Sequence, residues 1–188
     1  IKLYSARILA LTAEIPHLGR MEAPQASVKR RSPLCGSTVT VDVRVEEGRL
    51  AEMKQDVKAC ALGQAAAAVV GGAAPGASLT QITTARDQLR AMLKGEGPVP
   101  DAPFDGFEVL TPASAYKNRH ASIMLSIEAL TEAMQQAETQ RKLASVKRSL
   151  PQPTSPNIQQ KKRRTSCKGW RRKSACLMWD PLCRNPTR

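Results

Sequence analysis

The sequence contains no apolar run of about 18 residues, which a membrane-spanning helix needs, and no stretch that reads as a signal peptide. We therefore expect neither secretion nor insertion into a membrane, and the cytoplasm is the default location. Disulfides are rare in that compartment. Cys35 and Cys60 are accordingly expected to be thiols that are either buried or bound to a metal.

Acidic residues are nearly missing from the C-terminal part of the chain. Residues 141–188 hold 14 of the 29 lysines and arginines but only one of the 16 acidic residues. Residues 1–140 are thus charge-balanced, and the formal net charge of +13 belongs to the tail. Because a Pro-rich linker at 151–156 precedes the charge runs and apolar periodicity is lost, we expect one domain over 1–140 and a basic, mostly disordered tail over 141–188.

Several catalytic patterns are also lacking. We find no Ser/His/Asp set, no Gly-rich phosphate loop and no paired carboxylates, so a hydrolase or a nucleotide-dependent enzyme is not expected. The tail cysteines Cys167, Cys176 and Cys183 form no Cys-x-x-Cys pair, which argues against a zinc ribbon. Trp170 and Trp179 lie among the basic runs, so nucleic-acid binding by the tail remains an alternative to a solvated extension or a gene-model artefact.

What the domain does contain is a clear strand pattern. Residues 38–46 alternate strictly, with four valines on one face, and a Glu-Gly turn leads to a weaker strand at 50–58. Helical patterns follow, one of which opens with a Ser-x-x-Gln capping box. The prediction is an α+β domain, with a small antiparallel sheet (hairpin about 38–58) flanked by helices at 3–14, 60–70, 78–94 and 116–142, and with residues 20–34 irregular.

The predicted hairpin brings its two cysteines together. With the turn centred on Glu47 and Gly48, Cys35 and Cys60 fall within about one residue of facing each other. Extended pairing places facing Cβ atoms roughly 4.5–7 Å apart. That separation suits a shared metal centre, but it also approaches disulfide range, and two small core cysteines are a further alternative.

Three local features favour a metal at these cysteines. Gly36 permits a close backbone approach or a positive φ. Cys60 is expected at a helix start, where the helix dipole favours the thiolate, and Lys58 adds positive charge nearby. Thiolates are the form that binds soft metals and iron–sulfur clusters.

These segments resemble the N-terminal scaffold domain of NifU- and IscU-type proteins. The resemblance rests on Arg-Ser-Pro-Leu-Cys-Gly-Ser at 31–37, the hairpin, Ala-Cys-Ala-Leu-Gly-Gln-Ala at 59–65, and Leu-Arg-Ala-Met-Leu-Lys-Gly-Glu-Gly-Pro at 89–98. It covers about residues 3–135. It implies a non-enzymatic role: assembly of a [2Fe–2S] cluster and its transfer to apo-proteins, with a cysteine desulfurase as a partner.

The chain departs from the family pattern at two places. The family aspartate after Cys-Gly is Ser37 here, and the third cysteine is absent from Lys-Asn-Arg-His-Ala-Ser-Ile at 117–123. One alignment matches His120 to the family histidine, and another places Ser122 where the cysteine stands. A variant branch of the family carries Cys-Gly-Ser and Arg-His-Ala-Ser together, which suggests a coherent altered site.

The resemblance implies a ligand set for iron or the cluster. Its members are Cys35, Cys60 and His120, because imidazole can replace thiolate on iron. The residues expected around these ligands are Gly36, Ser37, Lys58, Arg119 and Ser122. His120 has the alternative of capping the last helix or pairing with an acid. The competing function is that of a zinc-bound sulfur acceptor for a cysteine desulfurase. A homodimer is a further expectation for the oligomeric state.

Overall fold

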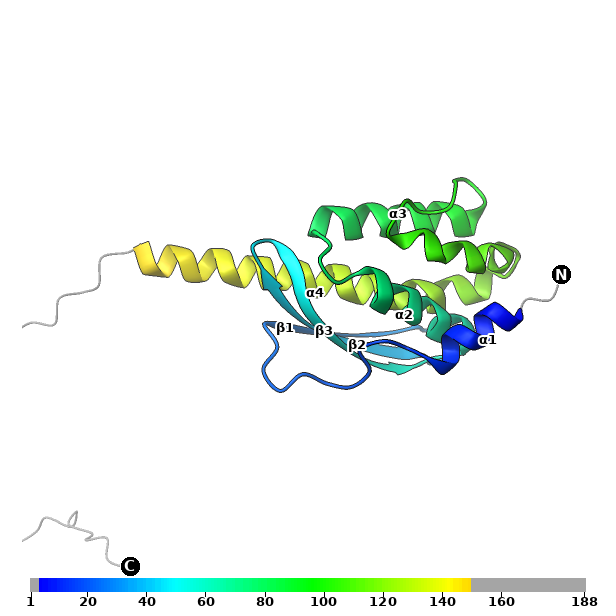
Figure 1. Ribbon diagram of the computed structural model, residues 1–188, viewed down its shortest axis with the longest axis horizontal. Helices are drawn as coiled ribbons and strands as arrows, with labels where there is room; N and C mark the ends of the chain where they lie inside the picture. The colour runs from blue at the N-terminus through cyan, green and yellow to red at the C-terminus, as the bar shows by residue number, and fades with distance from the viewer. Residues whose placement is uncertain (1–3, 150–188) are drawn as a thin grey trace, which may run out of the picture. The chain divides into compact units, whose positions relative to one another are not determined.

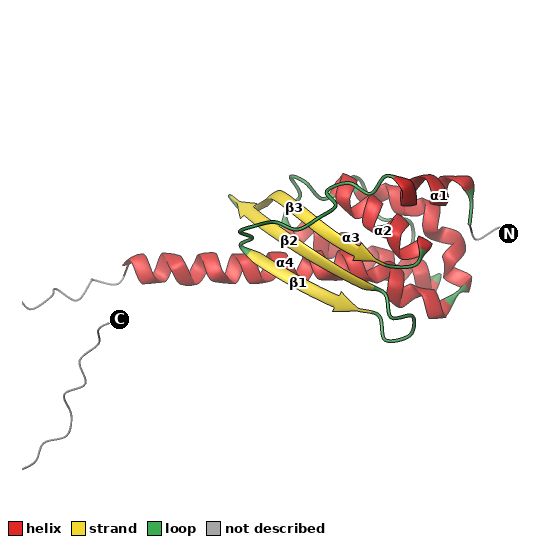
Figure 2. Ribbon diagram, turned by 90° about the horizontal axis from the view of Figure 1, so that it is seen from below, coloured by secondary structure: helices red, strands yellow, loops and turns green. Residues whose placement is uncertain are grey.

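The computed structural model describes residues 4–149, which belong to one compact unit. Three strands lie together on one side and the helices lie behind them (Figures 1 and 2). The elements are α1 (Ala6–Ala13), β1 (Ala26–Arg31), β2 (Thr38–Glu46), β3 (Arg49–Lys58), α2 (Ala61–Ala73), α3 (Leu79–Lys94), the 3₁₀ segment η1 (Phe104–Ala115) and α4 (Lys117–Ser149). The predicted α+β class, a small antiparallel sheet flanked by helices, is confirmed. Among the described residues, no helix is long and apolar enough to cross a membrane.

The β2–β3 hairpin follows the valine alternation. Val39, Val41, Val43 and Val45 are all buried on the face that the helices cover. Glu47 and Gly48 form the turn with φ values of 50° and 80°, as a two-residue hairpin turn requires. The register shifts between Arg44 and Val45, so most facing pairs are displaced by one residue from those that the turn alone sets.

The prediction that residues 20–34 are irregular is wrong for β1. This strand pairs antiparallel with β2 at the edge of the sheet, in the order β1-β2-β3. Only Ala26 and Val28 are buried, and the strand then runs into Lys-Arg-Arg. Two apolar positions are too few for a period-2 signal, and β2 supplies the ladder that makes the segment a strand.

The helices pack in layers behind the sheet. α4 contacts β1 and β2, and α2 and α3 pack against α4. The predicted capping box of α3 is present, with Ser78 and Gln81 bonded reciprocally, and Gly95 ends the helix in the left-handed conformation. The η1 segment was not predicted; it buries Phe104 and Phe107, whose rings stack at 6.4 Å.

The last helix is longer than the predicted 116–142. α4 continues to Ser149, so the predicted domain boundary at residue 140 falls inside a helix. The rest of the predicted tail, with its three cysteines and two tryptophans, lies outside the described residues.

Candidate metal and cluster site

The candidate site forms where three segments meet. Cys35 lies in the tight loop between β1 and β2, Cys60 is the N-cap residue of α2, and Ser122 lies near the start of α4. Gly36 adopts the positive φ of 69° that its residue type permits, and its N–H donates to Ser32 O at 3.1 Å. The loop therefore presents Cys35 at the surface, while Cys60 is half-buried.

Two buried hydroxyls connect the cysteines. Ser37 Oγ lies 3.0 Å from Cys35 Sγ, and Ser122 Oγ lies 3.3 Å from Cys60 Sγ. Ser122 Oγ in turn donates to Ser37 Oγ at 3.3 Å. The side chains come from three different segments, so the fold, and not local sequence, assembles this row of sulfur and oxygen atoms.

The hydrogen-bond directions in this row follow from counting donors. Ser37 Oγ accepts from Ser122 Oγ and from the backbone N–H of Cys60 at 3.4 Å. A hydroxyl has two acceptor sites and one proton, so the Ser37 proton is left to donate to Cys35 Sγ. The Ser122 proton is used on Ser37, so the Ser37 proton is directed at the Cys35 sulfur.

Hydrogen bonds from the hydroxyls of Ser32 and Ser37 lower the pKa of the Cys35 thiol to about 6, against the opposing effect of burial. Ser32 Oγ is buried and has no hydrogen-bond partner within residues 4–149 when the thiol is protonated, so its proton is free to turn toward a thiolate at Cys35. At neutral pH, Cys35 is thus largely a thiolate, the form that binds metals and attacks sulfur.

This lowered pKa predicts the pH profile of alkylation. Iodoacetamide reacts with the thiolate, so the rate at Cys35 should rise through a midpoint near pH 6. An unperturbed cysteine has its midpoint near pH 8.5. Ser37→Ala removes one donor to the thiolate and should move the midpoint upward. Mass spectrometry of the Cys35 peptide checks this, and a wild-type midpoint near pH 8.5 would contradict it.

His120 is held apart from the two cysteines. Its Nε2–H is shared between the carbonyl oxygens of Ala113 and Ser114, at 3.1 and 3.2 Å. Successive residues of an α-helix are about 100° apart, so His120 and Ser122 point in directions about 200° apart from α4. Ser122 has the cysteine-facing position, and a ligand role for His120 stays a prediction.

The remaining predicted neighbours lie at the margin of the site. Lys58 is exposed at the end of β3, with Nζ 3.9 Å from a carboxylate oxygen of Asp56, and Arg119 is half-buried at the start of α4. Within residues 4–149 there is no group of three or more His, Cys, Asp or Glu side chains placed to hold a metal. The side-chain oxygens that contact the two sulfurs within residues 4–149 are those of Ser37 and Ser122.

Two residues of the site were missed by the sequence reasoning. Ser32 was not singled out, because nothing in the sequence shows that its hydroxyl is buried beside Cys35. Gly63 was not singled out either, although an added Cβ there would lie 2.7 Å from Ser122 Oγ. This glycine lets α2 and α4 approach closely enough for Ser122 to reach Cys60.

The chain is similar to known proteins in sequence and fold. The profile of the NifU-like N-terminal domain family matches residues 3–144. The crystal structure of the N-terminal part of a nitrogen-fixing NifU-like protein from Brucella abortus is 36% identical, with a TM-score of 0.71, over 73% of this chain and 95% of that chain. No curated protein matches the chain.

More distant structures share the fold. A candidate iron–sulfur cluster assembly scaffold for the SUF system from Fervidobacterium islandicum is 18% identical, with a TM-score of 0.64, over 70% of this chain and 96% of that chain. A hypothetical protein solved at 2.3 Å is 20% identical, with a TM-score of 0.62, over 68% and 96% of the two chains. The family match and the Brucella relative together show that this chain belongs to the NifU-like N-terminal domain family of iron–sulfur cluster assembly scaffolds.

Proposed function

We propose that the chain receives iron and sulfide, holds a [2Fe–2S] cluster on Cys35 and Cys60, and passes the cluster to apo-proteins. The row of Cys35, Ser37, Ser122 and Cys60 carries the proposal, because it gathers two thiols at one partly exposed point of the fold. Binding to iron requires both cysteines as thiolates. The hydroxyl of Ser37 and a pKa lowered to about 6 hold Cys35 in that form at neutral pH.

The two serines fit a labile site. A hydroxyl binds iron more weakly than a thiolate does, since iron–sulfur clusters are held by cysteine thiolates. Ser37 and Ser122 would donate hydrogen bonds to the cluster or its thiolates, or supply one oxygen ligand. A cluster that is held by two thiolates, one of them the exposed Cys35, is transferred to an acceptor more easily than a cluster held by four buried thiolates.

The serine row predicts unequal effects of two neighbouring substitutions. Ser122→Ala should lower cluster retention by about 10–100-fold, the usual cost of losing a group that orients metal ligands. His120→Ala should change retention little, because His120 binds the carbonyls of η1. Ser122→Cys should slow cluster loss, since it adds a third thiolate. The measurement is the rate at which the visible absorption decays when a chelator is added.

Transfer of the cluster to an acceptor protein provides a second measurement on the same variants. Wild-type protein loaded without oxygen should restore the spectrum of an apo-ferredoxin on mixing, and Ser122→Cys should transfer more slowly. If His120→Ala abolishes the cluster and Ser122→Ala leaves it intact, the proposed ligand environment is wrong and the imidazole is the third ligand.

A second candidate, sulfur acceptance, is favoured by the exposed and largely deprotonated Cys35. Its thiolate would attack the outer sulfur of a desulfurase persulfide. A new S–S bond forms on Cys35, the old S–S bond breaks, and the desulfurase cysteine leaves as a thiolate. Zinc would then occupy the site in place of a cluster. Incubation with a cysteine desulfurase and cysteine, followed by mass spectrometry for a persulfide on Cys35, tests this role.

A further inference from the structure

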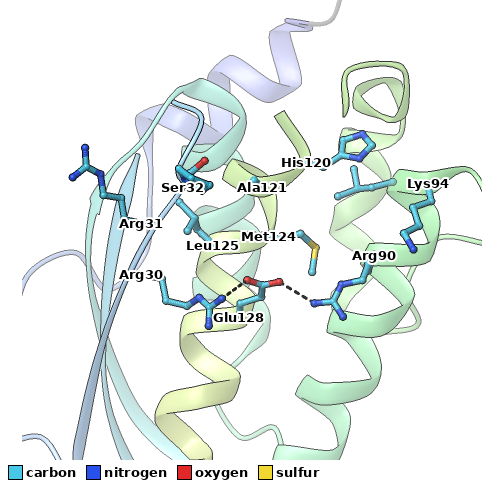
Figure 3. Close-up of a pocket in the computed structure, with 12 residues that line it drawn as sticks. Arg30, Arg31, Ser32, Arg90, Lys94, His120, Ala121, Met124, Leu125 and Glu128 are labelled. Atoms are coloured by element: carbon cyan, nitrogen blue, oxygen red, sulfur yellow. Dashed lines mark hydrogen bonds and ion pairs between the residues drawn. The ribbon is translucent and has the colours of Figure 1, made fainter. Parts of the chain in front are cut away.

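A pocket of about 340 Å³ lies beside the site, between β1, α3 and α4 (Figure 3). Its apolar lining comes mainly from Leu93 of α3 and from Met124 and Leu125 of α4. A volume of this size is at the small end of ligand-binding pockets and holds one large side chain with its flanking backbone. The pocket is thus large enough for one anchor residue of another chain.

The charged lining of the pocket is mostly basic. Four of its residues are basic (Arg30, Arg31, Arg90 and Lys94) and one, Glu128, is acidic. Arg30 of β1 and Arg90 of α3 reach Glu128 of α4 from opposite sides, at 3.0 and 2.9 Å (Figure 3). One carboxylate is therefore shared by two guanidinium groups.

Lys94 and Arg31 supply the charges that are free to bind an anion. Both are exposed, and neither makes an ion pair with a residue in 4–149. Arg30 and Arg90 also pair with Glu132 and Asp87, outside the pocket, so they are largely satisfied within the protein. An incoming carboxylate would meet Lys94 at the edge of an apolar hollow.

The pocket shares its walls with the candidate site. Ser32 and Pro33, which lead into Cys35, form one side. Ala121, the neighbour of Ser122, belongs to the other. A chain docked there would lie next to the segments that carry Cys35 and Ser122.

We infer that this pocket docks an acidic segment of a partner protein, with one large apolar side chain inserted between α3 and α4. The apolar lining favours a peptide side chain over a nucleic-acid phosphate. The chain's own tail is a poor occupant, because 14 of its charged residues are basic and one is acidic. This inference needs no cluster, so it stands or falls separately from the proposed function.

The test uses the full-length protein without iron. The probes are a fluorescein-labelled peptide of aspartates and glutamates around one central leucine, the same peptide with serine for leucine, and a single-stranded oligonucleotide of equal charge. The basic tail attracts all three, so the difference between the two peptides isolates the pocket. Burying a leucine side chain should make the leucine peptide bind about tenfold tighter or more.

Two substitutions that reverse one charge each test whether the peptide binds in this pocket. Lys94→Glu should remove most of the preference for the leucine peptide, whereas Lys142→Glu, an exposed residue further along α4, should not. A photo-leucine version of the peptide should cross-link to residues 93–94 or 121–125. Equal binding of the two peptides, no binding, or cross-links confined to the tail would each overturn the inference.

Discussion

Cys60→Ala should abolish the visible absorption that the wild-type chain acquires when it is reconstituted with iron and sulfide without oxygen. The same loss is expected for Cys35→Ala. Each substitution leaves a single thiolate in the described part of the site, since no other group of metal-binding side chains is gathered within residues 4–149. One thiolate beside two hydroxyls is too weak a ligand set to hold a cluster. Absorption spectra with iron analysis check the result.

The tail offers a matched control for these variants. Cys167, Cys176 and Cys183 can bind iron adventitiously in any chain that carries them. The triple variant with alanine at all three should keep the wild-type spectrum. A spectrum that survives Cys60→Ala and disappears in the triple variant would move the cluster to the tail and contradict the assigned site.

Gly63→Ala should destabilise the domain by about 1–3 kcal/mol, the usual cost of forcing an extra group into a packed interface. Its Cβ would lie 2.7 Å from Ser122 Oγ and 2.9 Å from Ala59 Cβ, so α2 and α4 must move apart. The same movement separates Ser122 from Cys60. Urea unfolding of the metal-free protein, followed by circular dichroism, measures the stability, and a chelator challenge of the loaded protein measures the loss of cluster.

Gly72 provides the comparison within the same helix. An added Cβ there meets no atom within 4 Å, and the residue is exposed. Gly72→Ala should therefore raise stability by about 0.4–1 kcal/mol through the smaller entropy of the unfolded chain. If both substitutions stabilise the domain equally, close packing of α2 on α4 does not position Ser122.

Local signals in the sequence predicted the elements that depend on local chemistry. The capping box of Ser78 and Gln81 predicted the start of α3, and the valine alternation predicted β2. The hairpin register stayed open to within one residue from the sequence, because the bulge that shifts it depends on the pairing of both strands. β1 and η1 were not predicted for a related reason. β1 is a strand because it pairs with β2, and η1 is held in place by its buried phenylalanines.

The sequence named both cysteines of the site and, as their neighbours, Ser37 and Ser122, but it named neither Ser32 nor Gly63. The hairpin brings Cys35 and Cys60 near each other in any register that the turn allows. The choice between His120 and Ser122 depends on the rotation of α4, and two residues of a helix so close in sequence cannot face the same point. The packing of α4 on β2, α2 and α3 sets that rotation, and Gly63 allows the close approach of α2.

Iron, zinc and acid-labile sulfide analysis of the full-length chain, reconstituted without oxygen, tests the central claim most directly. The proposed function predicts iron and inorganic sulfide in equal amounts, little zinc, and loss of both iron and sulfide in the Cys35→Ala, Cys60→Ala double variant. Iron without sulfide, or zinc alone in a protein that gives no visible spectrum, would contradict a role in holding clusters. Zinc with a persulfide on Cys35 would favour sulfur acceptance instead.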